Sequence, residues 1–560
     1  MKSTKGRGRS RQGRAKADSR PAFGCGADLV VFRTGSEEGV KFAAAELARY
    51  LAQVSGREVA CQWRRRYDPG PGLWVGVAPH LEGAVPLDLL AAADVLDDAL
   101  FADVSGNAGV ISGSNGRSVL FAVYRYLEAL GCRWFRPGKD GEFVPRLRAL
   151  PRGRIRMLER PSARHRCVCI EGACSIRHVR DMIDYAARRG FNAYFLQFRN
   201  AYTFFERWYG RENPNGRIDF TTAAAARAWD RAKAEARRRG LLLHTVGHGW
   251  TCEPFGISGL EWAPTKQRIP PPVIRHLARI DGHRGLYQGM PLNTNLCYSS
   301  PQVRRIMAAA VADYAGEHPD EGLIHVWLAD GTNNQCECDR CCSARPSDFY
   351  VQILNQIDAL LTARRLATRI VFLAYVDLLW APRAEKIANP DRFILMFAPI
   401  TRSFTAPLLT AGGRCRKPAG RLPPYRRNRL VFPSGTEDNL RFLDQWRRSF
   451  AGACVDFDFH LMFDPTWDPS GMEIVPVLHR DLRNLPALEM DGYISAQRTR
   501  IAFPTGVAMH VMGRTLWNAK AGYQGLVDSY FRDLFGAAGD DVYRYLTRLG
   551  RLSMAAVLRG

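Results

Sequence analysis

Segment 326–342, VWLADGTNNQCECDRCC, contains a carboxylate and a group of cysteines that lie close together in the sequence. An apolar run leads into one carboxylate, Asp330, and then into a glycine and an amide-rich stretch. Four cysteines follow within seven positions. A carboxylate directly after a buried strand is well placed for acid, base or nucleophilic work, and clustered thiols can hold a metal ion. The segment therefore suggests two hypotheses, a catalytic Asp330 and a metal clip.

The metal hypothesis rests on Cys336, Cys338 and Cys341, whose spacing resembles the CxxC-type pairs that tetrahedral zinc favours. A fourth ligand would come from Cys342 or from a distant residue such as Cys297. A disulfide and free thiols are the alternatives. Because an all-thiolate shell leaves no open coordination position, any zinc would be structural, and catalysis would require no cofactor. We expect the cluster to hold the loop that follows the carboxylate.

Eight apolar runs, separated by helix-length stretches, follow about residue 160 and form the expected framework around this segment. Such alternation predicts a (β/α)8 TIM barrel, in which reactive residues follow the carboxyl ends of the strands. We assign the barrel to residues 156–505. The runs are RCVCIEG (166–172), FNAYFLQF (191–198), GLLLHTVGHGW (240–250), GLIHVWLADG (322–331), IVFLAY (370–375), FILMFAPI (393–400), ACVDFDFHLMF (453–463) and DGYISAQ (491–497).

The flanking segments differ from the barrel in pattern. Residues 26–155 alternate apolar strands with helical stretches, which predicts a small α/β domain. Its glycine-rich turn SGSNGRS (112–118) lacks the full spacing of a nucleotide-binding loop and is interpreted as a strand-to-helix turn. Residues 506–560 indicate a helical C-terminal region. Residues 1–25 are basic and nearly free of apolar side chains at their start, which favours a disordered arm.

Composition narrows the class of protein. The chain has 560 residues, 46% of them hydrophobic, and a net charge of +24, which is typical of a large folded protein. Eight of the basic residues lie in positions 1–20 and the rest are spread through helical stretches, so we expect no nucleic-acid partner. There is no apolar run of 18 residues and no legible signal peptide, so we expect a cytoplasmic protein that does not enter a membrane.

Polar and aromatic residues follow the predicted strand ends, where a barrel would bring them together. Carboxylates and amides hydrogen-bond vicinal hydroxyls, and aromatic rings cover the C–H faces of a pyranose. We therefore expect an oligosaccharide or glycan substrate at this rim. Trp327, inside the fourth run, fits either the rim or the core. The expected substrate-binding residues are Glu171, His248, Trp250, Asn333, Asn334, Tyr375, Asp377, Arg402 and Asp458.

Long segments of the chain resemble the family known as domain of unknown function 4838, some of whose members are classed as glycoside hydrolase family 163 with endo-acting β-N-acetylglucosaminidase activity. The N-terminal part looks like the small domain that precedes the barrel in family 20 hexosaminidases and family 67 α-glucuronidases. The resemblance covers almost all of the chain after residue 25. It is carried by GHGWTCEPFG (247–256), PLNTNLCYSSPQVRR (291–305), HVWLADGTNNQCECDRC (325–341), PSDFYVQILNQID (346–358) and FILMFAPITR (393–402).

This resemblance implies a glycoside hydrolase for β-linked N-acetylhexosamine-containing glycans, with an acetamido-assisted retaining mechanism. Hexosaminidases of this kind carry an Asp–Glu pair after the fourth strand, whereas this chain has Asp330–Gly331. The partner of Asp330 would then be Glu253 or Glu337, which completes the set of candidate catalytic residues.

Two alternatives remain open. One is an α-glucuronidase-like hydrolase, in which Arg199 or Arg402 would bind a uronate carboxylate. The other is a catalytically silent glycan-binding protein, which the missing Glu supports.

Overall fold

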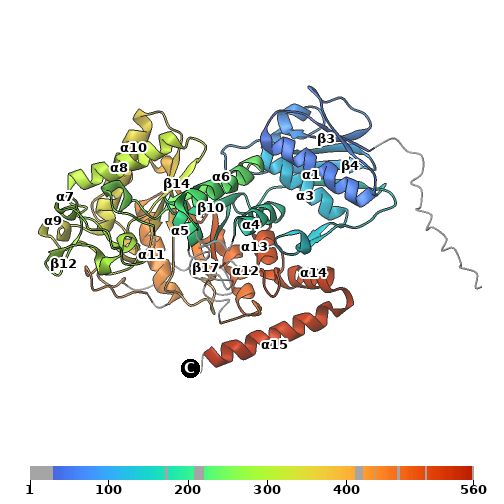
Figure 1. Ribbon diagram of the computed structural model, residues 1–560. Helices are drawn as coiled ribbons and strands as arrows, with labels where there is room; N and C mark the ends of the chain where they lie inside the picture. The colour runs from blue at the N-terminus through green and yellow to red at the C-terminus, as the bar shows by residue number, and fades with distance from the viewer. Residues whose placement is uncertain are drawn as a thin grey trace, which may run out of the picture.

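The computed structural model describes residues 29–170, 175–206, 220–260, 262–409, 421–433, 435–462, 467–498 and 501–557. The chain forms a sheet domain, a closed barrel and a group of C-terminal helices (Figure 1). The predicted basic arm, residues 1–25, lies outside the described residues. Within those ranges, none of the helices combines the length and apolar character that crossing a membrane would require.

The N-terminal domain is a six-stranded sheet packed on two helices, α1 (Glu38–Ser55) and α3 (Gly116–Ala129). The helices approach closely because both carry glycine at the contact: a Cβ on Gly39 would lie 2.9 Å from the backbone of Gly116. The turn before α3 is a helix cap, in which Asn115 accepts the Ser118 N–H. The strand order is β2 (Ala60–Trp63), β1 (Val30–Arg33), β3 (Gly72–Val77), β5 (Ala108–Gly113), β4 (Leu100–Ser105) and β8 (Arg154–Glu159), with β4 antiparallel to both neighbours.

A buried carboxylate joins this domain to the barrel. Asp98 forms ion pairs with Arg117 of α3 at 2.9 Å and with Arg166 of the first barrel strand at 2.7 Å. Burial opposes ionisation of Asp98, but the two guanidinium groups together hold its pKa well below its usual range. The carboxylate is therefore charged and fixed between the two parts of the chain.

The barrel confirms the prediction from the eight apolar runs, because each run overlaps one of its strands. Every neighbouring pair is parallel and the sheet closes on itself. The strands are β9 (His165–Ile170), β10 (Ala193–Gln197), β11 (Leu242–Gly247), β14 (Leu323–Val326), β15 (Arg369–Ala374), β16 (Phe393–Phe397), β17 (Ala453–Leu461) and β18 (Gly492–Gln497). The main outer helices are α4 (Ile176–Arg188), α6 (Thr222–Arg238), α8 (Pro301–Glu317), α10 (Pro346–Ala363), α11 (Thr436–Ser449) and α12 (Ile474–Asn484).

Three histidines lie together among the buried side chains of the barrel strands. His244 Nδ1 lies 2.8 Å from His325 Nε2, and the ring of His165 lies 6.0 Å from that of His244. Phe195 stacks on His325 at 4.0 Å. Burial lowers the pKa of all three imidazoles, and that of His244 falls to about 3. The cluster is therefore uncharged at neutral pH, as its buried setting demands.

Strand β17 has two faces of opposite chemistry, because successive side chains point to opposite sides of a strand. Phe457 and Phe459 belong to the apolar cluster inside the barrel. Asp456, Asp458 and His460 alternate with them and are fully buried on the other face. Carboxylates of this strand therefore face the surrounding layer of helices instead of the barrel interior.

The C-terminal region consists of α13 (Val507–Trp517), α14 (Tyr523–Phe535) and α15 (Gly539–Val557). Figure 1 shows α13 beside α4, α14 to the right of α13, and α15 along the lower edge of the molecule. Helix α13 contacts both α12 and α14. These helices pack on the barrel and reach the N-terminal domain through Arg514, which forms an ion pair with Glu128 of α3 at 2.8 Å.

Candidate active site

A cavity of 320 Å³ lies where the carboxyl ends of six barrel strands meet. This is the face at which barrel enzymes place their reactive groups. Residues within or just after β10, β11, β14, β15, β16 and β17 all contribute to it, together with two residues from the segment between β11 and β14. Its lining residues are Gln197, His248, Trp262, Asn293, Trp327, Asp330, Leu373, Tyr375, Ile400, Phe457, Phe459 and Met462.

Asp330 presents its carboxylate to this cavity in a fixed orientation. Its Oδ1 accepts the backbone N–H of Gly331 at 2.8 Å and the hydroxyl of Tyr375 at 3.2 Å. Its own N–H donates to Leu292 O at 3.0 Å. Within the described part of the chain, Oδ2 has no hydrogen-bond partner. One oxygen is therefore anchored by the protein, and the other is available to a ligand.

His248 stands beside Asp330 as a neutral hydrogen-bonding group. Burial lowers the pKa of its imidazole, and the nearby Asp330 carboxylate offsets this only in part. Its ring meets Trp327 at 4.7 Å and Trp262 at 5.1 Å, both edge to face. Among the described residues, neither His248 Nδ1 nor Trp327 Nε1 has a protein partner. Buried polar atoms normally find partners, so each of these two is free to bond water or a polar ligand in the cavity.

The backbone at the end of β11 allows this packing. Gly247 has φ +85°, a conformation that L side chains rarely adopt. A Cβ at this position would also lie 3.1 Å from the Trp327 ring. Glycine thus lets the indole lie against the strand end and form a wall of the cavity.

A buried amide network fixes the loop that carries Asp330. Asn334 Nδ2 donates to Asp330 O at 2.7 Å and to Asn293 O at 2.8 Å. Asn295 Nδ2 in turn donates to Asn334 Oδ1 at 2.8 Å. Asn334 was expected to hold substrate hydroxyls, but it is fully buried and its amide is used up by these contacts. It acts on the site by holding two of its walls together.

Three other expected substrate-binding residues lie outside the cavity. Trp250 is fully buried, and its indole N–H donates to His325 O at 2.8 Å, so it is a core residue. Asp377 is also fully buried and accepts the Tyr425 hydroxyl at 2.9 Å, while burial raises its pKa to about 6. Asn333 Oδ1 accepts the N–H of Leu430 at 3.2 Å. These three expected substrate-binding residues therefore do not line this cavity.

Arg402 and Asp458 do not line the cavity either, because both belong to a buried ion network on the outer face of β17. Arg402 pairs with Asp458 at 2.9 Å and with Asp481 of α12 at 2.7 Å. His460 Nε2 lies 3.0 Å from the same Asp481 carboxylate. These acids and the histidine are close enough to hold a metal ion, but the Arg402 guanidinium already supplies the positive charge between the two carboxylates.

The two carboxylates proposed as partners of Asp330 are engaged elsewhere. Glu253 forms an ion pair with Arg199 at 2.8 Å, and burial raises the pKa of Glu253 while Arg199 counters that rise. Glu337 accepts Asp281 N–H and Asn428 Nδ2, each at 2.8 Å. Neither lines the cavity.

Glu171 lies outside the described residues. Among the described lining residues, Asp330 is therefore the only carboxylate.

Of the site residues predicted from the sequence, Asp330, His248 and Tyr375 line the cavity. Most of the residues that form its apolar walls were not predicted. Phe457 and Phe459 could have been found from the two-residue alternation of β17, which separates them from Asp458. Asn293 stands in a segment that had been singled out only for its family resemblance. Trp262 lies in a long connection with no periodic pattern, so no signal in the sequence pointed to it. The expected metal ligands, Cys336, Cys338 and Cys341, do not line the cavity.

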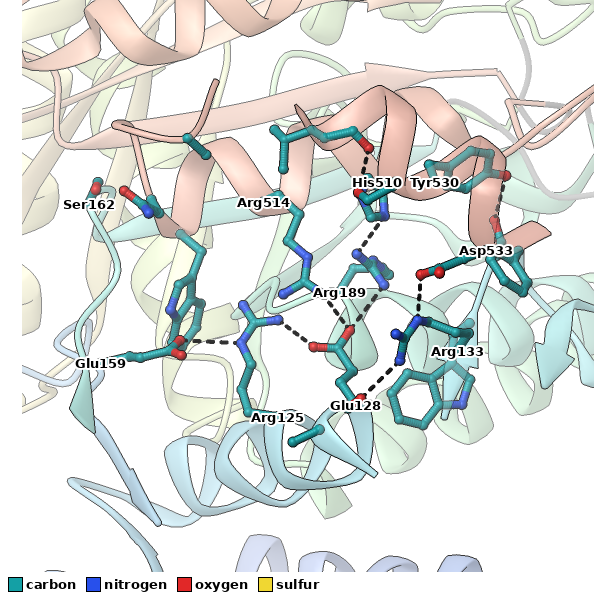
Figure 2. Close-up of a pocket in the computed structure, with 18 of the residues that line it drawn as sticks. Arg125, Glu128, Arg133, Glu159, Ser162, Arg189, His510, Arg514, Tyr530 and Asp533 are labelled. Carbon is teal, nitrogen blue, oxygen red and sulfur yellow. Dashed lines mark hydrogen bonds and ion pairs between the residues drawn. The ribbon is translucent and has the colours of Figure 1, made fainter. Parts of the chain in front are cut away.

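A larger cavity, of 790 Å³, lies between α3, β8, α13 and α14 (Figure 2). At its centre, Glu128 accepts hydrogen bonds from Arg125 at 2.9 Å and Arg514 at 2.8 Å. Arg189 approaches the same carboxylate at 3.4 Å. Burial opposes ionisation of Glu128, but the three guanidinium groups together lower its pKa to about 2.

This larger cavity is at the wrong end of the barrel for catalysis. Ser162 precedes β9 and Arg189 precedes β10, so both lie at the amino ends of their strands. Residues at that end of a barrel normally serve stability. The carboxylate of Glu128 is committed to guanidinium groups, and we interpret this cavity as the packing junction of the three parts of the chain.

Three solved structures are similar to this chain, and the two with TM-scores above 0.5 show the fold. A family GH115 4-O-methyl-α-glucuronidase with specificity for decorated arabinogalactans aligns with a TM-score of 0.57 at 13% identity, over 94% of this chain and 62% of that chain. A GH138 enzyme targeting pectin rhamnogalacturonan II gives a TM-score of 0.54 at 11% identity, over 94% and 70%. A mutant Streptomyces plicatus β-hexosaminidase in complex with GlcNAc gives 0.47 at 12% identity, over 93% and 91%.

This chain thus spans less than two thirds of the length of the first of these proteins. No family model matches the chain, and no curated protein matches it. The resemblance to the domain of unknown function 4838 family stays a prediction.

Proposed function

We propose that this protein is a glycoside hydrolase whose active site is the cavity at the carboxyl ends of the barrel strands. The observation that carries the proposal is Asp330, which offers one unpaired carboxylate oxygen in a cavity that the rings of Trp327 and Tyr375 also line. Aromatic walls with a few convergent polar groups suit the mixed polar and apolar faces of a pyranose. Structural likeness to two carbohydrate-active enzymes supports the barrel as a scaffold for this chemistry.

The substrate we propose is a β-linked N-acetylhexosamine-containing glycan, cleaved with retention through the substrate's own acetamide. In that mechanism, a fixed carboxylate accepts the acetamide N–H and aligns its oxygen for attack on the anomeric carbon. Asp330 suits this role because Tyr375 and the Gly331 N–H hold Oδ1 while Oδ2 is available. Neutral His248 would hold a sugar hydroxyl through its unpaired Nδ1.

A uronic acid substrate is less well supported. Binding of a uronate carboxylate normally uses arginine, and the described lining residues include neither arginine nor lysine. The two arginines considered for this purpose are paired with acids: Arg199 with Glu253, and Arg402 with Asp458 and Asp481.

One observation favours a second candidate function, a glycan-binding protein without turnover. Glycoside cleavage needs a proton donor for the leaving oxygen in addition to the group that acts on the anomeric carbon. The described lining residues provide one carboxylate, Asp330, and no second acid.

Turnover and binding measurements on the full chain separate these functions. Aryl β-N-acetylglucosaminide should be hydrolysed, whereas the matched aryl β-glucoside and β-glucuronide should not, because they lack the acetamide. Asp330→Asn should lower kcat by roughly 10²- to 10⁴-fold. Asp391→Asn, at an exposed position, is the matched control and should leave kcat unchanged.

Equal hydrolysis of the glucoside would refute acetamide participation. Binding of N-acetylglucosamine oligomers without turnover by the wild type would support the binding protein and refute the hydrolase.

A further inference from the structure

Four cysteine sulfurs converge on one point beside the loop that carries Asp330. Cys297, Cys336, Cys338 and Cys341 place their Sγ atoms within 4.8 Å of one another. The Sγ of Cys297 lies 3.6 Å from that of Cys338 and 3.9 Å from that of Cys341. Four sulfurs bound to zinc at about 2.3 Å in a tetrahedron are separated by about 3.8 Å. The observed spacing therefore matches a tetrahedral shell of four cysteine sulfurs.

We infer that these four thiolates bind a structural zinc ion. The arrangement does not suit a disulfide, because a disulfide joins two sulfurs at about 2.05 Å and leaves the other pair aside. Cys342, the alternative fourth ligand, is exposed and does not belong to the group. The fourth ligand is Cys297, which lies 39 residues before Cys336 and could not be selected from spacing alone.

The surroundings of the sulfurs suit thiolates. The backbone N–H of Arg279 donates to Cys336 Sγ at 3.3 Å. The Arg284 guanidinium approaches Cys297 Sγ at 3.7 Å and Cys336 Sγ at 4.0 Å. Four thiolates and Zn²⁺ carry a net charge of −2, which a neighbouring guanidinium and N–H donors stabilise. Protons displaced from the thiols on metal binding pass to solvent.

The metal would join two segments that form walls of the cavity. Cys297 follows Asn293, a lining residue, and Cys336 follows Asp330 by six positions. Backbone hydrogen bonds attach both segments to residues 276–279, because Cys297 N–H donates to His276 O at 2.8 Å and Glu337 N–H to Arg279 O at 2.7 Å. The role of the metal in positioning Asp330 rests on the proposed function, whereas metal binding itself does not.

Metal analysis of the full chain, expressed with zinc and purified without chelators, tests the inference. We expect one zinc per chain by elemental mass spectrometry. Cys297→Ser should lose most of this zinc, and Cys342→Ser, the matched control, should retain it. Release of the zinc from the wild type during titration with an organomercurial reagent gives a measurement that does not depend on whether a variant folds. Zinc release should accompany the reaction of four thiols beyond the exposed ones, such as Cys61 and Cys342, which react without releasing metal.

A wild type without zinc, whether its four cysteines are free or joined as disulfides, would overturn the inference. Cys297→Ser with a full zinc content would overturn the assignment of the fourth ligand. Metal content and hydrolysis are separate readouts. One zinc per chain in a protein that cleaves no glycoside would refute the proposed hydrolase and support the metal site. Hydrolysis by a zinc-free protein would refute the metal site and support the proposed hydrolase.

Discussion

Acidification should destabilise the barrel through the cluster formed by His165, His244 and His325. These imidazoles are buried and neutral in the folded chain, and burial lowers their pKa values. In the unfolded chain they regain an ordinary pKa of about 6.5. The unfolded state therefore binds more protons than the folded state below that pH, and stability falls as the pH falls. The loss begins near pH 6.5 and, for His244, continues to about pH 3.

The magnitude for one histidine follows from the pKa of about 3 for His244. Each pH unit between the two pKa values is worth about 1.4 kcal/mol. At pH 5, protonation of this histidine in the unfolded state therefore lowers the free energy of unfolding by about 2 kcal/mol relative to pH 8. His244→Asn keeps a polar group beside His325 but cannot be protonated in this range. Between pH 8 and pH 5, the free energy of unfolding of the variant should fall by about 2 kcal/mol less than that of the wild type.

Hydrogen exchange followed by mass spectrometry is the suitable assay, because a chain with several parts need not unfold in one step. Opening free energies of peptides from β11 and β14 would be measured at both pH values after correction for intrinsic exchange rates. His283→Asn, at an exposed position, provides the control and should behave as the wild type. An equal pH dependence in the wild type and in His244→Asn would refute the reasoning.

Two further predictions concern buried acids. Asp456→Asn should raise the thermal unfolding midpoint, increasingly so as pH rises from 4 to 8. Burial, with the neighbouring Asp458, raises the pKa of Asp456, so the folded chain holds a proton that the unfolded chain releases. A lower midpoint than the wild type at pH 8 would contradict this. Glu128→Gln should lower the free energy of unfolding in urea by about 3 kcal/mol, because three guanidinium groups lose their shared carboxylate (Figure 2). Glu82→Gln, at an exposed position, is its control, and an equal effect of the two would contradict the prediction.

The barrel could be predicted because its strands are buried on both faces. Each strand then appears as a continuous apolar run, and eight such runs with helix-length spacers fit few other folds. Because both faces of each strand are buried, the sequence does not show which side chains point into the barrel. Asp458 and Phe459 are neighbours in one run, yet only the phenylalanine reaches the cavity.

The candidate site was less predictable for a further reason. Its position after strand ends identified Asp330, His248 and Tyr375, but the same criterion also selected Arg402 and Asp377, which form buried contacts with other segments. Which distant residues form contacts with one another depends on how loops and helices pack. The local sequence pattern does not contain that information. The convergence of Cys297 with the three later cysteines has the same origin.

The alternation along β17 also limits how this protein could change. Displacing the strand by one residue would turn Asp456 and Asp458 toward the cavity and press Phe457 and Phe459 against α12, so both faces would be mismatched at once. Natural variation or engineering that seeks another acid in the cavity is therefore confined to point replacement. On this strand, Phe457→Glu and Phe459→Glu would each place a second carboxyl in the chamber shared with Asp330 while leaving the Arg402 network in place.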